Sequence, residues 1–105
     1  APLFFKQGTP MLTVIATLSS ENSDAERLLT EIENLQQSSR QEVGCLRYEL
    51  SIKSEAEQTT YLVSEQWASN EHFEAHKNAP HFKAFGDAVG AFITSTNIDV
   101  YKTIG

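Results

Sequence analysis

The chain has 105 residues, with eight basic and fourteen acidic side chains and a formal net charge of −6. Its length fits a single domain. The acidic balance argues against nucleic acid as a partner, because phosphate binding requires a basic stripe, and it gives no attraction to an anionic membrane surface.

The single cysteine, Cys45, excludes an intramolecular disulfide and a cysteine-rich metal site. It stands in an apolar-rich segment, so we expect a small packing residue rather than a nucleophile. No apolar run approaches the roughly 20 residues that span a bilayer. Together these features predict a cytoplasmic protein.

Residues 1–10 differ in composition from the rest of the chain. They contain two prolines and the apolar group Leu3, Phe4 and Phe5, and they are too short for a signal peptide with separate charged and apolar regions. We expect an N-terminal extension or a leftover of cloning, with the domain itself spanning residues 11–105.

The first half of the domain predicts a strand and then a helix. Residues 11–18 alternate between apolar and polar or β-branched side chains, which is typical of a strand. Ser23 and Glu26 have the spacing of a capping box, which predicts that a helix starts there and runs to about Arg40. Its apolar residues share one helical face: Leu28, Leu29, Ile32 and Leu35.

The second half predicts a hairpin, a broken helix and a last strand. Strands over 44–52 and 61–68 flank a charged hairpin loop at 54–59. Ser69 is placed to cap a short helix, and Pro80 interrupts it because proline removes a helical hydrogen bond. A further helix carries Phe82, Phe85, Val89, Phe92 and Ile93 on one face, and residues 96–104 form the closing strand.

This order, β-α-β-β-α-β, predicts an α+β fold of the ferredoxin-like type, with a four-stranded antiparallel sheet and helices on one face. The strands carry apolar or aromatic residues on the second face as well, including Ile15, Leu62 and Tyr101. Left exposed, these would form a patch larger than soluble monomers usually tolerate. We therefore expect a homodimer that packs sheet face on sheet face.

Five segments carry a resemblance to a known family: Met11–Ala16, Glu42–Tyr48, Glu65–Trp67, Phe73–His76 and Pro80–Phe85. They resemble the antibiotic biosynthesis monooxygenase superfamily, and within it the bacterial quinol monooxygenases. The resemblance runs from Met11 to the last strand. It implies a dimeric α+β barrel that inserts one atom of molecular oxygen into quinols or other aromatic compounds without flavin, haem or metal. We accordingly expect no cofactor.

A haem-degrading branch of the same superfamily uses a histidine in the helix after its tryptophan. By spacing, that place in this chain lies near Gly86, which has no side chain to bind iron. The resemblance therefore does not extend to haem degradation.

Cofactor-free oxygenation requires a base that removes a phenolic or enolic proton, and histidine suits this role. The candidates are His76 and His81, with Glu65 as a catalytic carboxylate that orients an imidazole. The candidate substrate-binding residues are mostly aromatic: Trp67, Tyr48, Tyr61, Phe73, Phe82, Phe85 and Arg47. Each also has a simpler interpretation, since the phenylalanines have the spacing of a helical core and histidines at a helix break often only cap or pack.

His72 and His76 are four residues apart and would share a helix face, which raises the possibility of a metal site. The HExxH order of zinc proteases is absent, and no third ligand stands at an obvious spacing. The sequence therefore predicts no metal.

The primary hypothesis is a cofactor-independent monooxygenase for a quinol-like or other electron-rich aromatic substrate. Two alternatives remain open: an isomerase or lyase acting on a small oxygenated metabolite, and a non-catalytic ligand-binding dimer. Aromatic pocket walls would favour the first hypothesis, whereas Arg47 or Lys83 pointing inward would favour a phosphorylated or acidic metabolite.

Overall fold

The structure is a computed structural model that describes residues 10–105. Residues 1–9, and with them almost all of the expected extension over 1–10, lie outside the described part. The first strand begins at Leu12, one residue after the predicted start of the domain.

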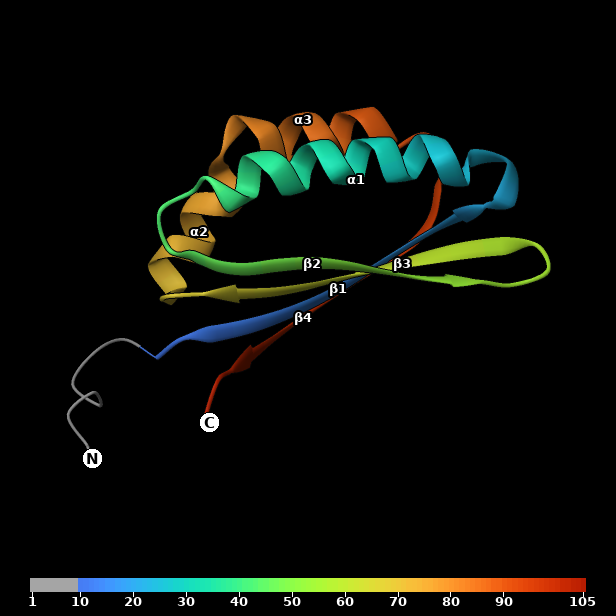
Figure 1. Cartoon of the computed structure of the whole chain (residues 1–105). Coiled ribbons are helices and arrows are strands. Elements are labelled where there is room, and N and C mark those ends of the chain that lie inside the picture. The colour runs from blue at the N-terminus through green and yellow to red at the C-terminus, as the bar shows by residue number, and fades with distance from the viewer. Residues whose placement is uncertain (1–9) are drawn as a thin grey trace.

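Four strands form one antiparallel sheet in the order β2-β3-β1-β4, so that β2 and β4 are its edges (Figure 1). The strands are β1 (Leu12–Glu21), β2 (Cys45–Ser54), β3 (Gln58–Trp67) and β4 (Ile93–Lys102). The predicted α+β, ferredoxin-like class is confirmed. The hairpin between β2 and β3 is tighter than predicted, because both strands extend further toward the turn.

The helices lie on one side of this sheet. Figure 1 shows α1 (Ala25–Arg40) and α3 (Pro80–Val89) side by side over the sheet, with α2 (Asn70–Asn78) at the end where β3 finishes. A short 3-10 turn, η2 (Asn22–Asp24), leads from β1 into α1. Among the described helices, none is both long and apolar enough to cross a bilayer.

The predicted break at Pro80 is confirmed. Ser69 caps α2, since its hydroxyl accepts a hydrogen bond from the backbone N–H of His72 at 3.2 Å. Ala79 then turns extended, with φ −71° and ψ 148°, and Pro80 takes the first position of α3, where its missing N–H is not needed. The chain therefore changes direction between His76 and His81.

Two predictions about helix ends are wrong. Ser23 does not begin α1 with a capping box: it lies inside the 3-10 turn, and Asp24 takes the N-cap position without a side-chain cap. The last helix also ends at Val89 rather than continuing through Phe92 and Ile93. Phe92 packs beneath the Arg27 guanidinium, 4.1 Å from its ring centroid, and Ile93 pairs with Ser20 of β1. The pairing of β4 with β1 therefore ends the helix before Ile93, although the apolar spacing of the sequence continues.

The strand register brings four side chains into one row on the face that the helices cover. Tyr48 is opposite Glu65, Glu65 is opposite Val14, and Val14 is opposite Val100. The alternating pattern of β1 buries its remaining helix-facing residues in the core: Leu12, Ala16 and Leu18. The polar pair Tyr48 and Glu65 thus lies within an otherwise apolar layer.

The opposite face is less apolar than the sequence suggested. Ile15 and Leu62 are half-buried and Tyr101 is exposed, but polar residues such as Ser64 and Asp99 lie between them. On the helix-covered side, the edge strand β4 is left partly bare, with Ile98 and Val100 both about half exposed. The homodimer through the sheet faces stays a prediction.

Candidate functional site

A cavity of about 250 Å³ lies between the helices and the sheet. Its lining is almost entirely apolar: Ala16, Leu18, Ile32, Leu35, Val63, Phe82, Phe85, Val89, Ile93 and Ile98, with Gly86 and Gly90. An apolar cavity of about 150 Å³ is enough to bind benzene in another protein. The volume in this chain therefore suits a small aromatic molecule of one or two rings.

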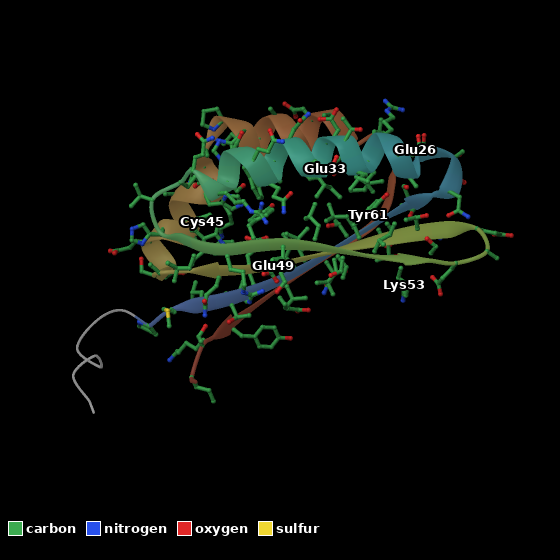
Figure 2. The ribbon with its side chains drawn as sticks, in the orientation of Figure 1. Glu26, Glu33, Cys45, Glu49, Lys53 and Tyr61 are labelled. Atoms are coloured by element: carbon green, nitrogen blue, oxygen red, sulfur yellow. The ribbon has the colours of Figure 1, made fainter. Side chains whose placement is uncertain are left out.

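The polar groups of the cavity come mainly from two neighbouring strands. Tyr48 of β2 and Glu65 of β3 are cross-strand partners, and both side chains line the cavity together with Thr96 of β4. Figure 2 shows side chains filling the layer between α1 and the sheet, with Tyr61 among them, whereas Lys53 lies toward the other side of the sheet. A ligand in the cavity would meet a carboxyl and a phenol on the sheet side.

Glu65 is buried, with only 5% of its surface exposed. Its Oε1 accepts a hydrogen bond of 2.8 Å from Trp67 Nε1. Burial raises the pKa of Glu65 from its ordinary value of 4.5 to about 7, although the bond from Trp67 opposes the rise. This carboxyl group is therefore poised to gain or lose a proton near neutral pH.

Tyr48 is held firmly by its backbone. Its carbonyl oxygen accepts hydrogen bonds from the Arg40 guanidinium at 2.8 and 3.1 Å and from Gln36 at 3.0 Å, which tie α1 to β2. Burial raises the pKa of the Tyr48 phenol well above its usual range, and the charge of Glu65 adds to the rise. Tyr48 therefore stays a neutral O–H donor.

A second polar group gathers behind the cavity. Oε2 of Glu42, in the loop before β2, lies 2.7 Å from His76 Nδ1 and 2.6 Å from His81 Nε2. The histidines come from α2 and α3, on either side of the break at Ala79 and Pro80. We call these three residues the histidine cluster. One carboxylate oxygen joins three elements of the chain.

His76 is also the centre of an aromatic group. Its ring centroid lies 4.6 Å from that of Trp67, 5.0 Å from Phe82 and 6.1 Å from Tyr48. Phe73 stacks at 6.2 Å. Burial lowers the pKa of His76, although its hydrogen bond to Glu42 opposes this change.

Eight of the ten predicted site residues lie in or near the cavity, in three groups. Tyr48, Glu65, Phe82 and Phe85 line the cavity. The second group, His76, Trp67 and Phe73, packs directly behind those walls without being part of the lining. His81, partly exposed, adjoins a smaller recess that it shares with Phe85.

Two predicted substrate-binding residues have other partners. The phenol of Tyr61 donates to the carbonyl of Ala25 at 2.8 Å, which anchors the start of α1. Arg47 donates to the Ser64 hydroxyl and lies 3.5 Å from the Glu49 carboxylate. Its ladder partner is Gln66, and it does not line the cavity.

Glu42 was not predicted as a site residue. It lies in a segment that carries the family resemblance, but a lone carboxylate in a loop has no periodic signal. His72 and His76, which share a helix face, do not form a pair of ligands. The His72 ring bonds to the Ser69 hydroxyl at 2.7 Å and takes no part in the cluster. The residue that does join His76 in the cluster, Glu42, is 34 positions away from it in the sequence.

Comparisons with known proteins agree with this architecture. The family model described as antibiotic biosynthesis monooxygenase matches residues 11–88. The Escherichia coli protein named "Probable quinol monooxygenase YgiN" is 31% identical over 102 residues, which cover 88% of this chain and 97% of that protein. The Bacillus subtilis protein YcnE, whose name also describes a monooxygenase, is 30% identical over 93 residues, covering 89% and 96%.

Solved structures show the same fold. The crystal structure of PA3566 from Pseudomonas aeruginosa has a TM-score of 0.80 at 32% identity and covers 92% of this chain and 97% of its own. A protein from Caulobacter crescentus, whose name places it among antibiotic biosynthesis monooxygenases, has a TM-score of 0.83 at 28% identity, covering 92% of each chain.

Proposed function

Because the chain belongs to the antibiotic biosynthesis monooxygenase family, we propose that it is a monooxygenase acting on a quinol-like or other electron-rich aromatic substrate, without a cofactor. The name of the Escherichia coli relative, which describes a quinol monooxygenase, supports the substrate class. The observation that carries the proposal is the Glu65 carboxyl, with its pKa of about 7, inside an apolar cavity of aromatic size.

In this proposal Glu65 removes a hydroxyl proton from the substrate. A phenol has a pKa of about 10, so transfer to a carboxylate of pKa about 7 is uphill by about 4 kcal/mol. A carboxylate of ordinary pKa would face a larger gap. The neutral Tyr48 phenol lines the same cavity and is the candidate donor to the substrate anion as it forms.

The anion is electron-rich enough to reduce molecular oxygen. For a hydroquinone, one oxygen atom enters the ring and the other leaves as water, while the substrate becomes a hydroxyquinone. The four electrons that O₂ accepts all come from the substrate, so the reaction needs no external reductant. The protein contributes the base, the donor and a largely apolar cavity wall around the reacting ring.

We propose positioning roles for His76 and His81, neither of which lines the cavity. The His76 ring packs on Trp67, whose indole N–H holds Glu65, and on Phe82 and Tyr48, which line the cavity. His81 in turn holds Glu42, the partner of His76. In this interpretation the histidine cluster keeps the cavity walls and the base in place and does not itself take the substrate proton.

The lining disfavours a phosphorylated or acidic substrate. Within the described residues, the cavity wall contains no lysine or arginine, and its one carboxyl would repel an anion. Arg47 and Lys83 do not line it. We also propose that the protein works as a homodimer through its sheet faces, as the resemblance implies.

Oxygen uptake by the purified protein tests the proposal. The wild-type protein is first incubated with a chelator, which is then removed. It is mixed with single-ring and two-ring quinols, O₂ consumption is followed at an electrode, and products are identified by mass spectrometry. We expect turnover of at least one quinol, and a loss of at least about 100-fold in Glu65→Gln. Glu55→Gln is the matched control, since Glu55 is exposed at the hairpin loop and does not line the cavity. Equal activity of all three proteins would contradict the proposal.

A further inference from the structure

We propose that Glu42, His76 and His81 form a binding site for one divalent transition-metal ion per chain, of the kind that Zn²⁺ represents. The proposal does not rest on the proposed function, because none of the three residues lines the cavity. It rests on the geometry, the burial and the chemical nature of the donor atoms in the histidine cluster.

The donor atoms are already gathered. One oxygen or nitrogen from each residue lies within 4.8 Å of those of the other two, and Glu42 Oε2 is 2.6–2.7 Å from both nitrogens. Ligand atoms about 2.0–2.2 Å from a common Zn²⁺ are themselves roughly 3 Å apart or a little more. The Glu42 oxygen would have to move about 0.6 Å away from each nitrogen, and the two nitrogens would have to approach each other, so side-chain shifts of roughly 1 Å would admit an ion in place of the shared protons.

The donor set is chemically suitable. Two imidazoles and one carboxylate form the ligand set of several catalytic zinc sites, in which water occupies the remaining position. Imidazole nitrogen suits Zn²⁺, Fe²⁺, Cu²⁺ and Ni²⁺, whereas Mg²⁺ and Ca²⁺ prefer oxygen ligands. His76 would bind through Nδ1 and His81 through Nε2, the atoms that now face Glu42.

The cluster has a buried side and an accessible side. The side chain of His76 is 1% exposed and that of Glu42 is 15% exposed, but that of His81 is 28% exposed. An ion can therefore enter past His81 and keep water as a further ligand. The buried His76 is held by the aromatic rings around it, which orient its ligand atom in advance.

An ion here would join three separate elements. Glu42 belongs to the loop before β2, His76 to α2 and His81 to α3. Binding would lock the chain across the break at Ala79 and Pro80, behind the cavity wall. Because a ligand that binds only the folded chain stabilises it, we expect the melting temperature to rise when Zn²⁺ is added.

Metal binding can be measured without any activity assay. The tag-free protein is treated with EDTA, dialysed and titrated with Zn²⁺ by calorimetry, with bound metal counted by mass spectrometry. Co²⁺ serves as a spectroscopic probe whose visible absorption indicates nitrogen and oxygen ligands. We expect one ion per chain, and at least about 100-fold weaker binding in His81→Ala and Glu42→Gln, beyond the effect typical of residues that only support a ligand.

His72→Ala is the matched control, because His72 lies on the same helix as His76 but bonds to Ser69. It should bind Zn²⁺ as wild type does. Wild type that fails to bind one equivalent, or a His81→Ala variant that binds as tightly as His72→Ala, would overturn the proposal. The wild-type titration alone can overturn the proposal, so the experiment remains decisive even if a variant does not fold.

Discussion

The indole Nε1 of Trp67 donates a 2.8 Å hydrogen bond to the carboxylate of Glu65, two residues earlier on the same strand. Residues two apart point to the same face of a strand, so the bond is a consequence of local geometry. Both side chains are buried, and the carboxylate therefore has a defined orientation at the cavity. This pair links the most strongly shifted carboxyl group to the aromatic group around His76.

The first prediction concerns the pH dependence of turnover. Only ionised Glu65 can accept a proton, so kcat/KM should rise about tenfold per pH unit on the acid side and level off above about pH 7. Oxygen uptake between pH 5 and pH 9 measures this profile. A profile that stays flat from pH 5 to pH 7 would show that Glu65 is not the base.

The second prediction concerns stability. A carboxyl whose pKa rises from 4.5 to about 7 on folding stabilises the protein below pH 4.5, and this contribution is lost as the pH rises through 7. Glu65→Gln has no such loss. Between pH 5 and pH 8, the stability of Glu65→Gln relative to wild type should increase by about 2–3 kcal/mol. Urea unfolding at both pH values gives the difference, and Glu55→Gln, at the exposed hairpin loop, should show none.

The third prediction separates positioning from proton transfer at His76. His76→Ala should lower kcat about tenfold or more, because Trp67 and Phe82 lose the ring on which they pack. His76→Asn keeps a donor near Nδ1 for Glu42 and should recover part of the loss. The acid limb of the kcat/KM profile should stay near pH 7 in both variants. If that limb disappears in either one, His76 is itself the titrating group.

The fourth prediction concerns Gly44, whose φ is +89°. A side chain there would adopt a conformation that costs about 1–2 kcal/mol, and its Cβ would overlap the imidazole ring of His72, meeting Cγ first and lying 2.5 Å from Cδ2. Gly44→Ala should therefore destabilise the fold by more than about 2 kcal/mol, part of which His72→Ala should restore in the double variant. In Gly86→Ala, where a Cβ meets nothing within 4 Å, stability should rise by about 0.5–1 kcal/mol. Thermal unfolding of the four variants checks both signs.

The fifth prediction is a dimer at micromolar concentration, burying at least about 1,200 Å² in total. Leu62 is half-buried on the helix-free face, so Leu62→Lys should convert the dimer into a monomer. Val43→Lys, in an exposed loop, should leave the dimer intact. Sedimentation velocity distinguishes these outcomes. A monomeric wild type would refute the sheet-face interface.

The fold could be predicted well because each strand and helix carries its own periodic signal. The alternation of β1 and the cap at Ser69 are local properties, and both appear in the structure. The end of α3, in contrast, is not determined by a local sequence signal. The apolar spacing continues across Gly90, and only the pairing of Ile93 with Ser20 shows that a strand has begun.

The site was predicted in part. Glu65 and Tyr48 lie on helix-facing strand positions that alternation identifies, so their burial could be anticipated. The partner of His76 could not, because the contact with Glu42 joins a loop to a helix across 34 positions. Nothing in the spacing of the sequence encodes that distance. Similarly, Tyr61 is aromatic and inward-facing, yet its hydroxyl bonds to the start of α1.

The position of β4 has a consequence for how molecules enter the cavity. Ile98 forms part of the cavity wall, is about half exposed, and belongs to an edge strand that pairs only with β1 in the described sheet. Edge strands open by local fluctuation at lower free energy than central ones. Transient opening of β4 would therefore widen this side of the cavity, and we expect amide hydrogens along that strand to exchange with solvent more slowly once a ligand occupies the cavity.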